Sequence, residues 1–172
     1  MAGSVLDGKR VLAVDDEPDV LSTLEDEIRA ASPTCAFETA TTYADAAQKL
    51  ASRGYDVVIL DIMGVRGFEL LEQAVKRNFR VAMLTAHSLN PESLKRAFDM
   101  RAQAYLPKEK LGEIVPFLED VLTYDYLPGW KQLLTRLGAF FEERFGKLQA
   151  GYEIYKELQE EMQDKIRRTR NG

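Results

Sequence analysis

Acidic, hydroxyl and amine side chains follow four short apolar runs of this sequence. Asp15 and Asp16 follow the first run, Asp61 and Thr85 end the next two, and Lys108 follows the last. The carboxyl ends of parallel strands meet at one edge of a sheet, where open α/β sheets bind ligands. We therefore expect these five side chains to converge on one site if the runs are parallel strands.

Three neighbouring carboxylates raise each other's pKa, so a divalent cation would be needed to keep all of them ionised. Mg²⁺ prefers oxygen ligands, and the absence of His and Cys from this set argues against zinc. A carboxylate can act as a nucleophile toward phosphorus and form an aspartyl-phosphate. Lys108 would then pair with the phosphate and Thr85 would donate a hydrogen bond to it. The cluster predicts phosphoryl chemistry with Mg²⁺ as cofactor, and with Mn²⁺ as an alternative ion.

The elements that would position this cluster alternate between strand and helix patterns up to about residue 123. The run that ends at Asp61 suits a strand buried on both faces. Asn90 and Pro91 signal the start of a helix, whereas Pro116 predicts a kink inside a helix from about 110 to 122. The alternation predicts an α/β fold with a doubly wound, five-stranded parallel sheet, which we expect in the flavodoxin-like order 2-1-3-4-5.

The bulk composition fits one domain with a small appendage: 172 residues, 45% hydrophobic and 30% charged. The net charge is -5, and residues 124–172 carry 9 basic and 8 acidic residues, or +1, which leaves -6 for the rest. An acidic first part argues against nonspecific nucleic-acid binding through it. A single cysteine and the lack of a long apolar stretch predict a cytoplasmic protein that does not span a membrane.

Four motifs together resemble the receiver domain of bacterial two-component response regulators, of the chemotaxis-regulator type, over about residues 9–123. They occur in order along the chain as Val14-Asp15-Asp16-Glu17-Pro18, Leu60-Asp61, Leu84-Thr85-Ala86 and Leu106-Pro107-Lys108. The resemblance implies a signalling protein rather than an enzyme. Its phosphoryl group would come from a sensor histidine kinase or a phosphotransfer protein.

The resemblance also implies the role of each site residue. Asp61 would be phosphorylated. The Mg²⁺ ligands would be Asp15, Asp16, Asp61 and the backbone carbonyl of Met63. Thr85 and Tyr105 match the switch hydroxyl and the switch aromatic, and an inward swing of Tyr105 would report phosphorylation. The output face would comprise the helix after Asn90, the strand near 103–106 and the helix from about 110 to 122.

Two positions depart from the family pattern. Receivers usually carry a Met-Pro pair in the loop after the phosphorylated Asp and a Gly eight residues after it. Here Gly67 follows Asp61 by six residues, and residues 62–67 contain no Pro, so the loop is shortened. Glu109 follows Lys108 where Pro is usual. Neither departure removes an essential group, but the shorter loop would alter phosphoryl lifetime or kinase choice.

The chain divides into residues 1–123, the receiver, and residues 124–172, a helical extension. In the extension, apolar residues recur at intervals of seven: Leu134, Phe141, Leu148, Tyr155 and Met162. This stripe fits one long helix that pairs with its mate in a homodimer, or a helical hairpin that turns near Gly146 to Gly151. Glycines weaken a long helix, yet we favour the dimerising helix over the hairpin.

Two rival functions follow from the same sequence. A DNA-binding transcriptional regulator would use the basic residues Arg167, Arg168 and Arg170, although favourable charge at a helix C-terminus is the simpler explanation of them. Nucleic acid is therefore not an expected partner. A pseudo-receiver that takes no phosphate is opposed by the presence of Asp16, Asp61 and Lys108.

Overall fold

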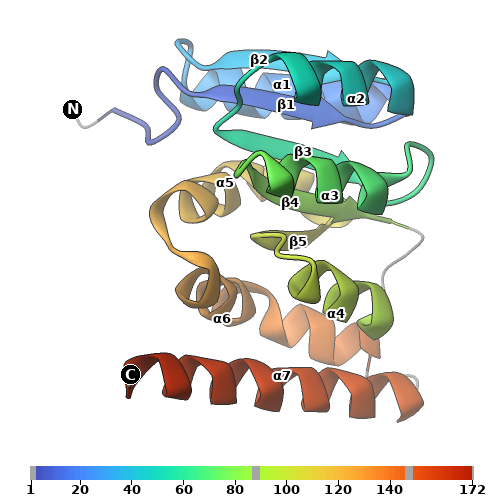
Figure 1. Cartoon of the computed structure of the whole chain (residues 1–172), viewed down its shortest axis with the longest axis vertical. Helices are drawn as coiled ribbons and strands as arrows, with labels where there is room; N and C mark the ends of the chain where they lie inside the picture. Colours follow the sequence, from blue (N-terminus) through green and yellow to red (C-terminus); the bar gives the residue numbers. More distant parts are fainter. Residues whose placement is uncertain (1–2, 87–89, 146–148, 172) are drawn as a thin grey trace.

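A five-stranded parallel sheet forms the centre of the computed structural model, which describes residues 3–86, 90–145 and 149–171. The strand order is β2-β1-β3-β4-β5, as the sequence predicted (Figure 1). The strands are β1 (Arg10–Val14), β2 (Ala36–Ala40), β3 (Val57–Asp61), β4 (Arg80–Thr85) and β5 (Ala104–Pro107). The flavodoxin-like α/β fold is therefore confirmed.

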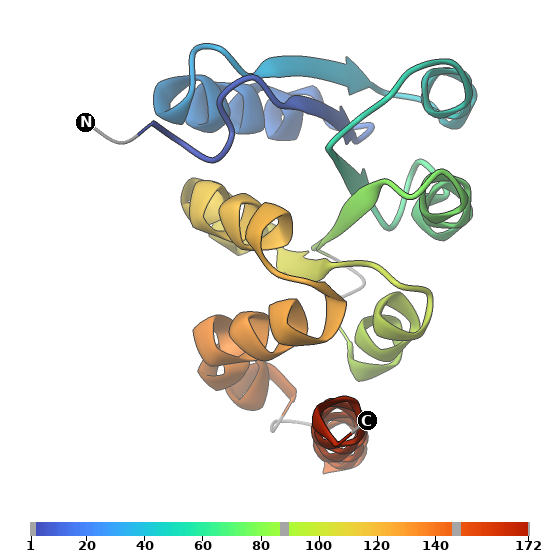
Figure 2. The ribbon, with the colours of Figure 1, turned by 60° about the vertical axis from the view of Figure 1, so that its left-hand side comes forward.

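Helices cover both faces of the sheet (Figure 2). α1 packs beside α5 on one face, and α2 packs beside α3 on the other, in the layer that α4 continues. The helices of this part are α1 (Pro18–Ala31), α2 (Tyr43–Ser52), α3 (Gly67–Lys76), α4 (Pro91–Asp99), the short 3-10 helix η1 (Lys108–Glu113) and α5 (Ile114–Thr123). Helices on both faces bury the central strands, which explains their continuous apolar runs.

Burial along the strands follows the composition of each run. Every residue of β3 is buried, including Asp61 at its end, and only the first residue of β1 is exposed. β2, an edge strand, is partly exposed along most of its length. The strands that carry the acidic residues therefore lie in the buried centre of the sheet.

Helix starts agree with the sequence signals, apart from one proline. The Asn90 side chain accepts a hydrogen bond from the backbone N–H of Ser93 at 2.7 Å, and Pro91 occupies the first turn of α4. The kink predicted at Pro116 is wrong, because α5 begins only at Ile114 and Pro116 falls in its first turn. A proline there removes no hydrogen bond, since the first N–H groups of a helix have no partner within it. The non-helical residue is Lys110, inside η1.

The C-terminal extension forms two helices, α6 (Tyr126–Phe145) and α7 (Gln149–Arg170), which pack against each other. The favoured single long helix is therefore wrong, and the hairpin alternative describes the chain. The helices are antiparallel, because Tyr155 packs on Phe141 while the end of α7 reaches Lys131 near the start of α6. Of the apolar stripe, Phe141, Tyr155 and Met162 are buried within the chain, and Leu148 lies outside the described residues. Gly146, where the hairpin was expected to turn, also lies outside them.

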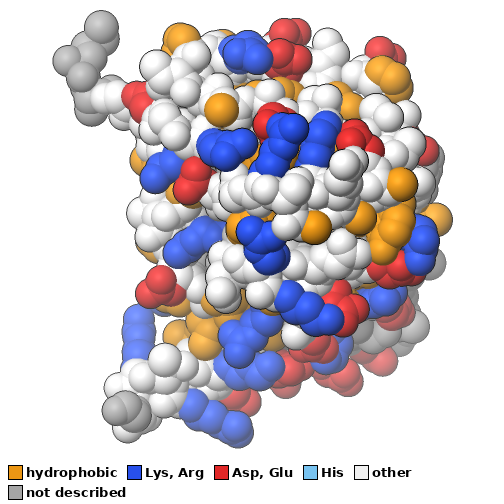
Figure 3. Space-filling model, turned by 45° about the horizontal axis from the view of Figure 1, so that its top comes forward, with side chains coloured by type: hydrophobic (Ala, Val, Ile, Leu, Met, Phe, Trp, Pro, Cys, Tyr) orange, Lys and Arg blue, Asp and Glu red, His pale blue; other side chains and the backbone are white. Residues whose placement is uncertain are grey.

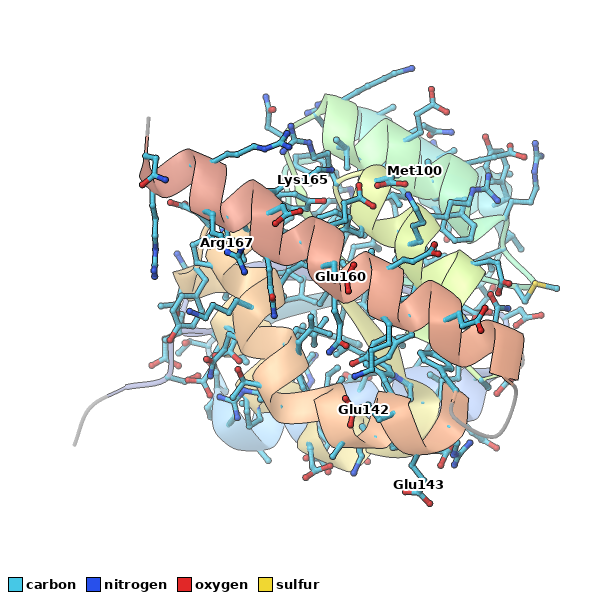
Figure 4. All side chains as sticks on the ribbon, turned by 90° about the horizontal axis from the view of Figure 1, so that it is seen from below. Met100, Glu142, Glu143, Glu160, Lys165 and Arg167 are labelled. Carbon is cyan, nitrogen blue, oxygen red and sulfur yellow. The ribbon has the colours of Figure 1, made fainter. Side chains whose placement is uncertain are left out.

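The α6–α7 hairpin continues both helical layers beyond the edge strand β5. α6 packs beside α5 and against β5, and α7 packs beside α4. Figure 4 shows α7 crossing the lower end of the molecule, with α4 on one side and α6 on the other. Lys165 lies on the α4 side of α7, where its ammonium is 5.0 Å from the ring centroid of Phe98. The hairpin thus covers an edge that would otherwise be open to other chains.

Two aromatic clusters fix the hairpin to the five-stranded α/β part of the chain. In the first, Phe98 of α4 stacks on Tyr126 and meets Trp130 edge-on, each at 5.3 Å between ring centroids. The buried Trp130 Nε1–H donates a hydrogen bond of 2.8 Å to the backbone carbonyl oxygen of Ala102. In the second cluster, Tyr105 of β5 meets Phe141 of α6 at 6.2 Å. Buried aromatic pairs with satisfied polar groups make this a specific interface.

Charged side chains of both signs are interspersed on the face seen in Figure 3, where hydrophobic side chains form only small, separate groups. Such a mixed surface creates no large field of one sign on this side of the molecule. Among the helices within 3–86, 90–145 and 149–171, none combines the length and the apolar character that crossing a bilayer demands.

Candidate functional site

The register of the sheet brings the predicted site residues to one edge. Val14 of β1 pairs with Leu60 of β3, so Asp15 and Asp61 follow directly from paired positions. Asp61 in turn pairs with Leu84 of β4. Thr85 pairs with Pro107 of β5, which places Lys108 next to the same edge.

Lys108 connects the acidic residues from the two central strands. Its Nζ lies 2.8 Å from Asp15 Oδ2 and 3.1 Å from Asp61 Oδ1. The side chains are 11%, 1% and 6% exposed respectively, so solvent screens these ion pairs only weakly. Glu17, at 3.8 Å from the same nitrogen, is much more exposed. One buried ammonium therefore faces two buried carboxylates that come from separate strands.

A pocket of about 140 Å³ lies above this edge. Thr85 opens into it, and within the described part of the chain the buried Thr85 Oγ1 has no hydrogen-bond partner. The pocket is lined by Asp16, Glu17, Asp61, Met63, Gly64, Thr85, Ala86 and Lys108. A buried hydroxyl without a partner costs free energy, so this one is suited to a ligand that accepts a hydrogen bond.

Burial and like charge shape the ionisation of the site. Burial, followed by the negative charge of Asp15, raises the pKa of Asp61 to about 6. The pKa of Asp15 is also raised, mainly by burial. Burial alone would lower the pKa of Lys108, but its close contacts with both carboxylates outweigh that effect and the pKa rises. Lys108 therefore stays protonated, but its single positive charge does not cancel the effect of burial on the pKa of Asp15 and Asp61.

The acidic triad Asp15, Asp16 and Asp61 is typical of a receiver Mg²⁺ site. The three can offer carboxylate oxygens that all lie within 4.8 Å of one another. Oxygens on opposite sides of one Mg²⁺ ion are about 4.2 Å apart, given bonds of about 2.1 Å. The all-oxygen donor set suits this ion, and the 4.8 Å limit is close to the largest oxygen-to-oxygen distance around it. Burial and like charge raise the pKa of Asp61, and a bound cation would oppose that rise.

Two glycines let the short loop after Asp61 pass close to the site. Gly64 has φ +82°, and a Cβ on it would lie 2.5 Å from Asp16 Oδ2. A Cβ on Gly67, the first residue of α3, would lie 2.1 Å from the backbone oxygen of Asp61. The loop therefore connects β3 to α3 without a Pro. Its Gly comes two residues earlier than in the family pattern because α3 starts directly against the end of β3.

Tyr105 lies on the same face of the sheet as Thr85, one strand away, and is fully buried. Its hydroxyl oxygen is 2.6 Å from Ser93 Oγ of α4. Burial raises the pKa of Tyr105, and the hydroxyl of Ser93 opposes the rise most strongly. The Thr85 hydroxyl is near enough to oppose it as well, although the two groups lack the geometry of a hydrogen bond. The two expected switch residues are therefore neighbours.

Sequence reasoning missed one contact next to the site. Glu109 forms an ion pair with Arg144 of α6, and the Arg144 guanidinium lies 5.0 Å from the ring centroid of Phe140. The sequence showed only that Glu109 replaces a usual Pro. Nothing local pointed to a partner 35 residues further along the chain.

These observations agree with the comparison to known families. Residues 11–118 match the response regulator receiver domain. This match covers more than half of the chain, so the chain belongs to that family. A receiver is a phosphoacceptor signalling module rather than a classical enzyme, and it implies a histidine kinase partner. The match ends within α5, before the α6–α7 hairpin begins.

Solved structures show the same fold. The BeF3-activated DrrB receiver domain is 21% identical, with a TM-score of 0.58, covering 67% of this chain and 98% of that one. A CheY-like receiver from Methanospirillum hungatei is 25% identical, with a TM-score of 0.54, covering 65% and 94%. A putative response regulator from Chloroflexus aurantiacus is 23% identical, with a TM-score of 0.59, covering 69% and 100%. No curated protein matches the chain.

Proposed function

We propose that this chain is a response regulator that accepts a phosphoryl group on Asp61 from the phosphohistidine of a sensor kinase or phosphotransfer protein. The observation that carries the proposal is the position of Lys108, within 3.1 Å of both Asp15 and Asp61 beside a pocket that Thr85 shares. A cation, an acceptor carboxylate and a hydroxyl donor then surround one small volume. That arrangement suits a phosphoryl group rather than a larger substrate.

In the proposed transfer, an Asp61 carboxylate oxygen attacks phosphorus while the bond between phosphorus and the kinase histidine nitrogen breaks. Mg²⁺, held by Asp15, Asp16, Asp61 and the backbone carbonyl of Met63, would neutralise charge on the phosphoryl oxygens when bound. Lys108 exchanges part of its contact with Asp61 for a phosphoryl oxygen. Thr85 Oγ1 gains the hydrogen-bond acceptor that it lacks among the described residues.

The output of this transfer would pass through the face that α4, β5 and α5 form. Phosphorylation draws Thr85 toward the phosphate, and Tyr105 is its neighbour on that face. Because Phe141 of α6 packs on Tyr105, a shift of Tyr105 changes how the α6–α7 hairpin docks. This is a two-state coupling between the phosphoacceptor site and the hairpin.

The homodimer expected through the C-terminal helices stays a proposal. The stripe residues Phe141, Tyr155 and Met162 are buried inside the chain, so a dimer would use the outer surfaces of α6 and α7. A cytoplasmic location likewise stays a prediction.

Phosphotransfer from acetyl phosphate with Mg²⁺, followed by intact mass, tests the proposal. We expect the protein to gain one phosphoryl group, and Asp61→Asn to gain none. Failure of the unaltered protein to gain mass, with acetyl phosphate and Mg²⁺ in excess, would reject phosphorylation at Asp61 and favour the pseudo-receiver.

A further inference from the structure

The chain segment that carries Lys108 is contacted by α6 on both sides. On one side, the ring of Phe141 packs on Tyr105 with 6.2 Å between ring centroids. On the other, Arg144 forms an ion pair with Glu109, the residue directly after Lys108. Phe141 and Arg144 are three residues apart, so they lie on one face of the helix. A single turn of α6 therefore holds both flanks of the site's buried cation.

The two contacts differ in strength. Phe141 and Tyr105 are each fully buried, so their packing is tight and its loss leaves a cavity. Arg144 and Glu109 are 40% and 54% exposed, and exposed ion pairs contribute little stability. A neighbouring contact supports the ion pair: the Lys110 ammonium lies 5.6 Å from the ring centroid of Phe140, also on α6. Packing at Phe141 therefore supplies most of the contact between α6 and the segment that carries Lys108. The Arg144 pair sets the position of α6 along that segment.

The position of Lys108 depends on this segment being held still. Its ammonium must lie within hydrogen-bonding distance of two carboxylates at once, at 2.8 and 3.1 Å. Preorganised charge of this kind speeds a reaction because no reorganisation is needed when charge develops, and displacements near 1 Å have large effects on rate.

We propose that Phe141 and Arg144 of α6 are positioning residues for the phosphoacceptor reaction, which hold Lys108 in place through Tyr105 and Glu109. This inference rests on the proposed phosphorylation of Asp61. The docked hairpin then promotes phosphorylation. The docked hairpin also stabilises the phosphorylated form at equilibrium, so by reciprocity phosphorylation tightens hairpin docking.

The test compares matched pairs of variants of the full chain. Phe141→Leu removes the ring on Tyr105, and its control is Phe79→Leu, just before β4, where the ring packs edge-on against Tyr55 and not on the hairpin. Arg144→Gln breaks the Glu109 pair, and its control is Arg136→Gln, which breaks the ion pair of α6 with Asp120 of α5. Acetyl phosphate is the donor, so no kinase contacts are involved.

We expect Phe141→Leu to slow phosphorylation at saturating acetyl phosphate by about threefold to tenfold. Arg144→Gln should slow it by about twofold, as suits an exposed pair. The acetyl phosphate concentration that gives half the maximal rate should not change. Exchanging the charges with Glu109→Arg and Arg144→Glu together should restore the rate that either change alone lowers. Each control should keep the rate of the unaltered protein.

Trp130, the only tryptophan, reports hairpin docking because its buried indole contacts the receiver at Ala102. In the unaltered protein, phosphorylation should change the Trp130 fluorescence because the hairpin docks more tightly. The change should be smaller in Phe141→Leu. Far-ultraviolet circular dichroism checks that each variant folds. The exposed Arg144→Gln keeps the test valid if Phe141→Leu does not fold.

Equal rates for the variants and their controls, or faster phosphorylation after either change, would overturn the inference. If the unaltered protein takes up no phosphoryl group, the proposed function itself fails, which is a separate result. The two failures are therefore distinguishable in one experiment.

Discussion

The Nζ of Lys108 lies 3.1 Å from Oδ1 of Asp61, and both side chains are almost fully buried. The same nitrogen contacts Asp15, so one cation serves two acids. Removing one partner of a buried pair leaves an uncompensated charge, which is costly, while an exposed pair contributes little.

We therefore expect Lys108→Met to lower the free energy of unfolding by about 2 to 4 kcal/mol without Mg²⁺. Adding Mg²⁺ should restore much of the loss, because the metal replaces the missing positive charge. Urea unfolding with EDTA and with Mg²⁺ measures both effects. The matched control is Lys110→Met, whose pair with Glu113 is far more exposed and whose effect should stay below about 1 kcal/mol. Equal losses for the two variants would contradict the prediction.

The raised pKa of Asp61 makes the metal-free protein sensitive to pH. Between its ordinary value of 3.8 and about 6, the folded protein keeps a proton that the unfolded chain has lost. Stability should therefore fall as the pH rises through this window, by at most about 3 kcal/mol at 1.36 kcal/mol per pKa unit. Asp61→Asn removes the titrating group and should flatten most of this slope. Unfolding measured from pH 4 to 7 with EDTA gives the comparison, and parallel slopes would refute the assignment.

Asp16 should matter for the metal and not for the fold. It is exposed, unlike Asp15 and Asp61, and forms no ion pair with other described residues. Asp16→Asn should change metal-free stability by no more than about 0.5 kcal/mol. Binding of Mg²⁺ at a hundred times its dissociation constant stabilises a protein by about 2.7 kcal/mol, and the variant should lose most of this gain. Thermal unfolding with and without Mg²⁺ measures it.

The control for this prediction is Asp19→Asn, which removes another exposed acid from the start of α1, away from the pocket. The full Mg²⁺ stabilisation should persist there. If Asp16→Asn also keeps it, Asp16 is not a ligand.

The shortened loop should tolerate no side chain at Gly67. A methyl group there would meet the Asp61 backbone oxygen at 2.1 Å, and neither backbone can yield without moving Asp61. Gly67→Ala should lower the free energy of unfolding by about 1 to 3 kcal/mol and slow phosphorylation. Gly54→Ala is the control, since a Cβ at Gly54 meets nothing within 4 Å. A crystal structure of Gly67→Ala with Asp61 unmoved would disprove the steric argument.

The sheet and its acidic edge were predictable because their signals are local. The run ending at Asp61 is apolar throughout, and its burial within the sheet is complete, so composition alone indicated a central strand. Parallel strands then had to bring Asp15, Asp61 and Lys108 to one edge. The kink predicted at Pro116 was wrong because the start of α5 depends on η1, a short 3-10 helix with no clear sequence signal.

The extension could not be predicted in the same way. An apolar stripe shows that a helix is buried but not against what, so Phe141 and Tyr155 fit a dimer as well as a hairpin. The choice depends on Phe98 and Tyr105, which are distant in sequence and become a surface for α6 only after the sheet has formed. Glu109 is a similar case, because its partner Arg144 belongs to that same later interaction.

The α6–α7 hairpin covers β5, so another protein that binds the same surface must compete with the hairpin for it. Only two residues separate α5 from α6, so the chain supplies its own ligand at a local concentration of about millimolar order. That concentration does not change when the protein is diluted. An external competitor present at micromolar levels must therefore bind this surface far more tightly than the tethered α6 does. A weaker competitor binds only the fraction of molecules in which α6 has dissociated from β5.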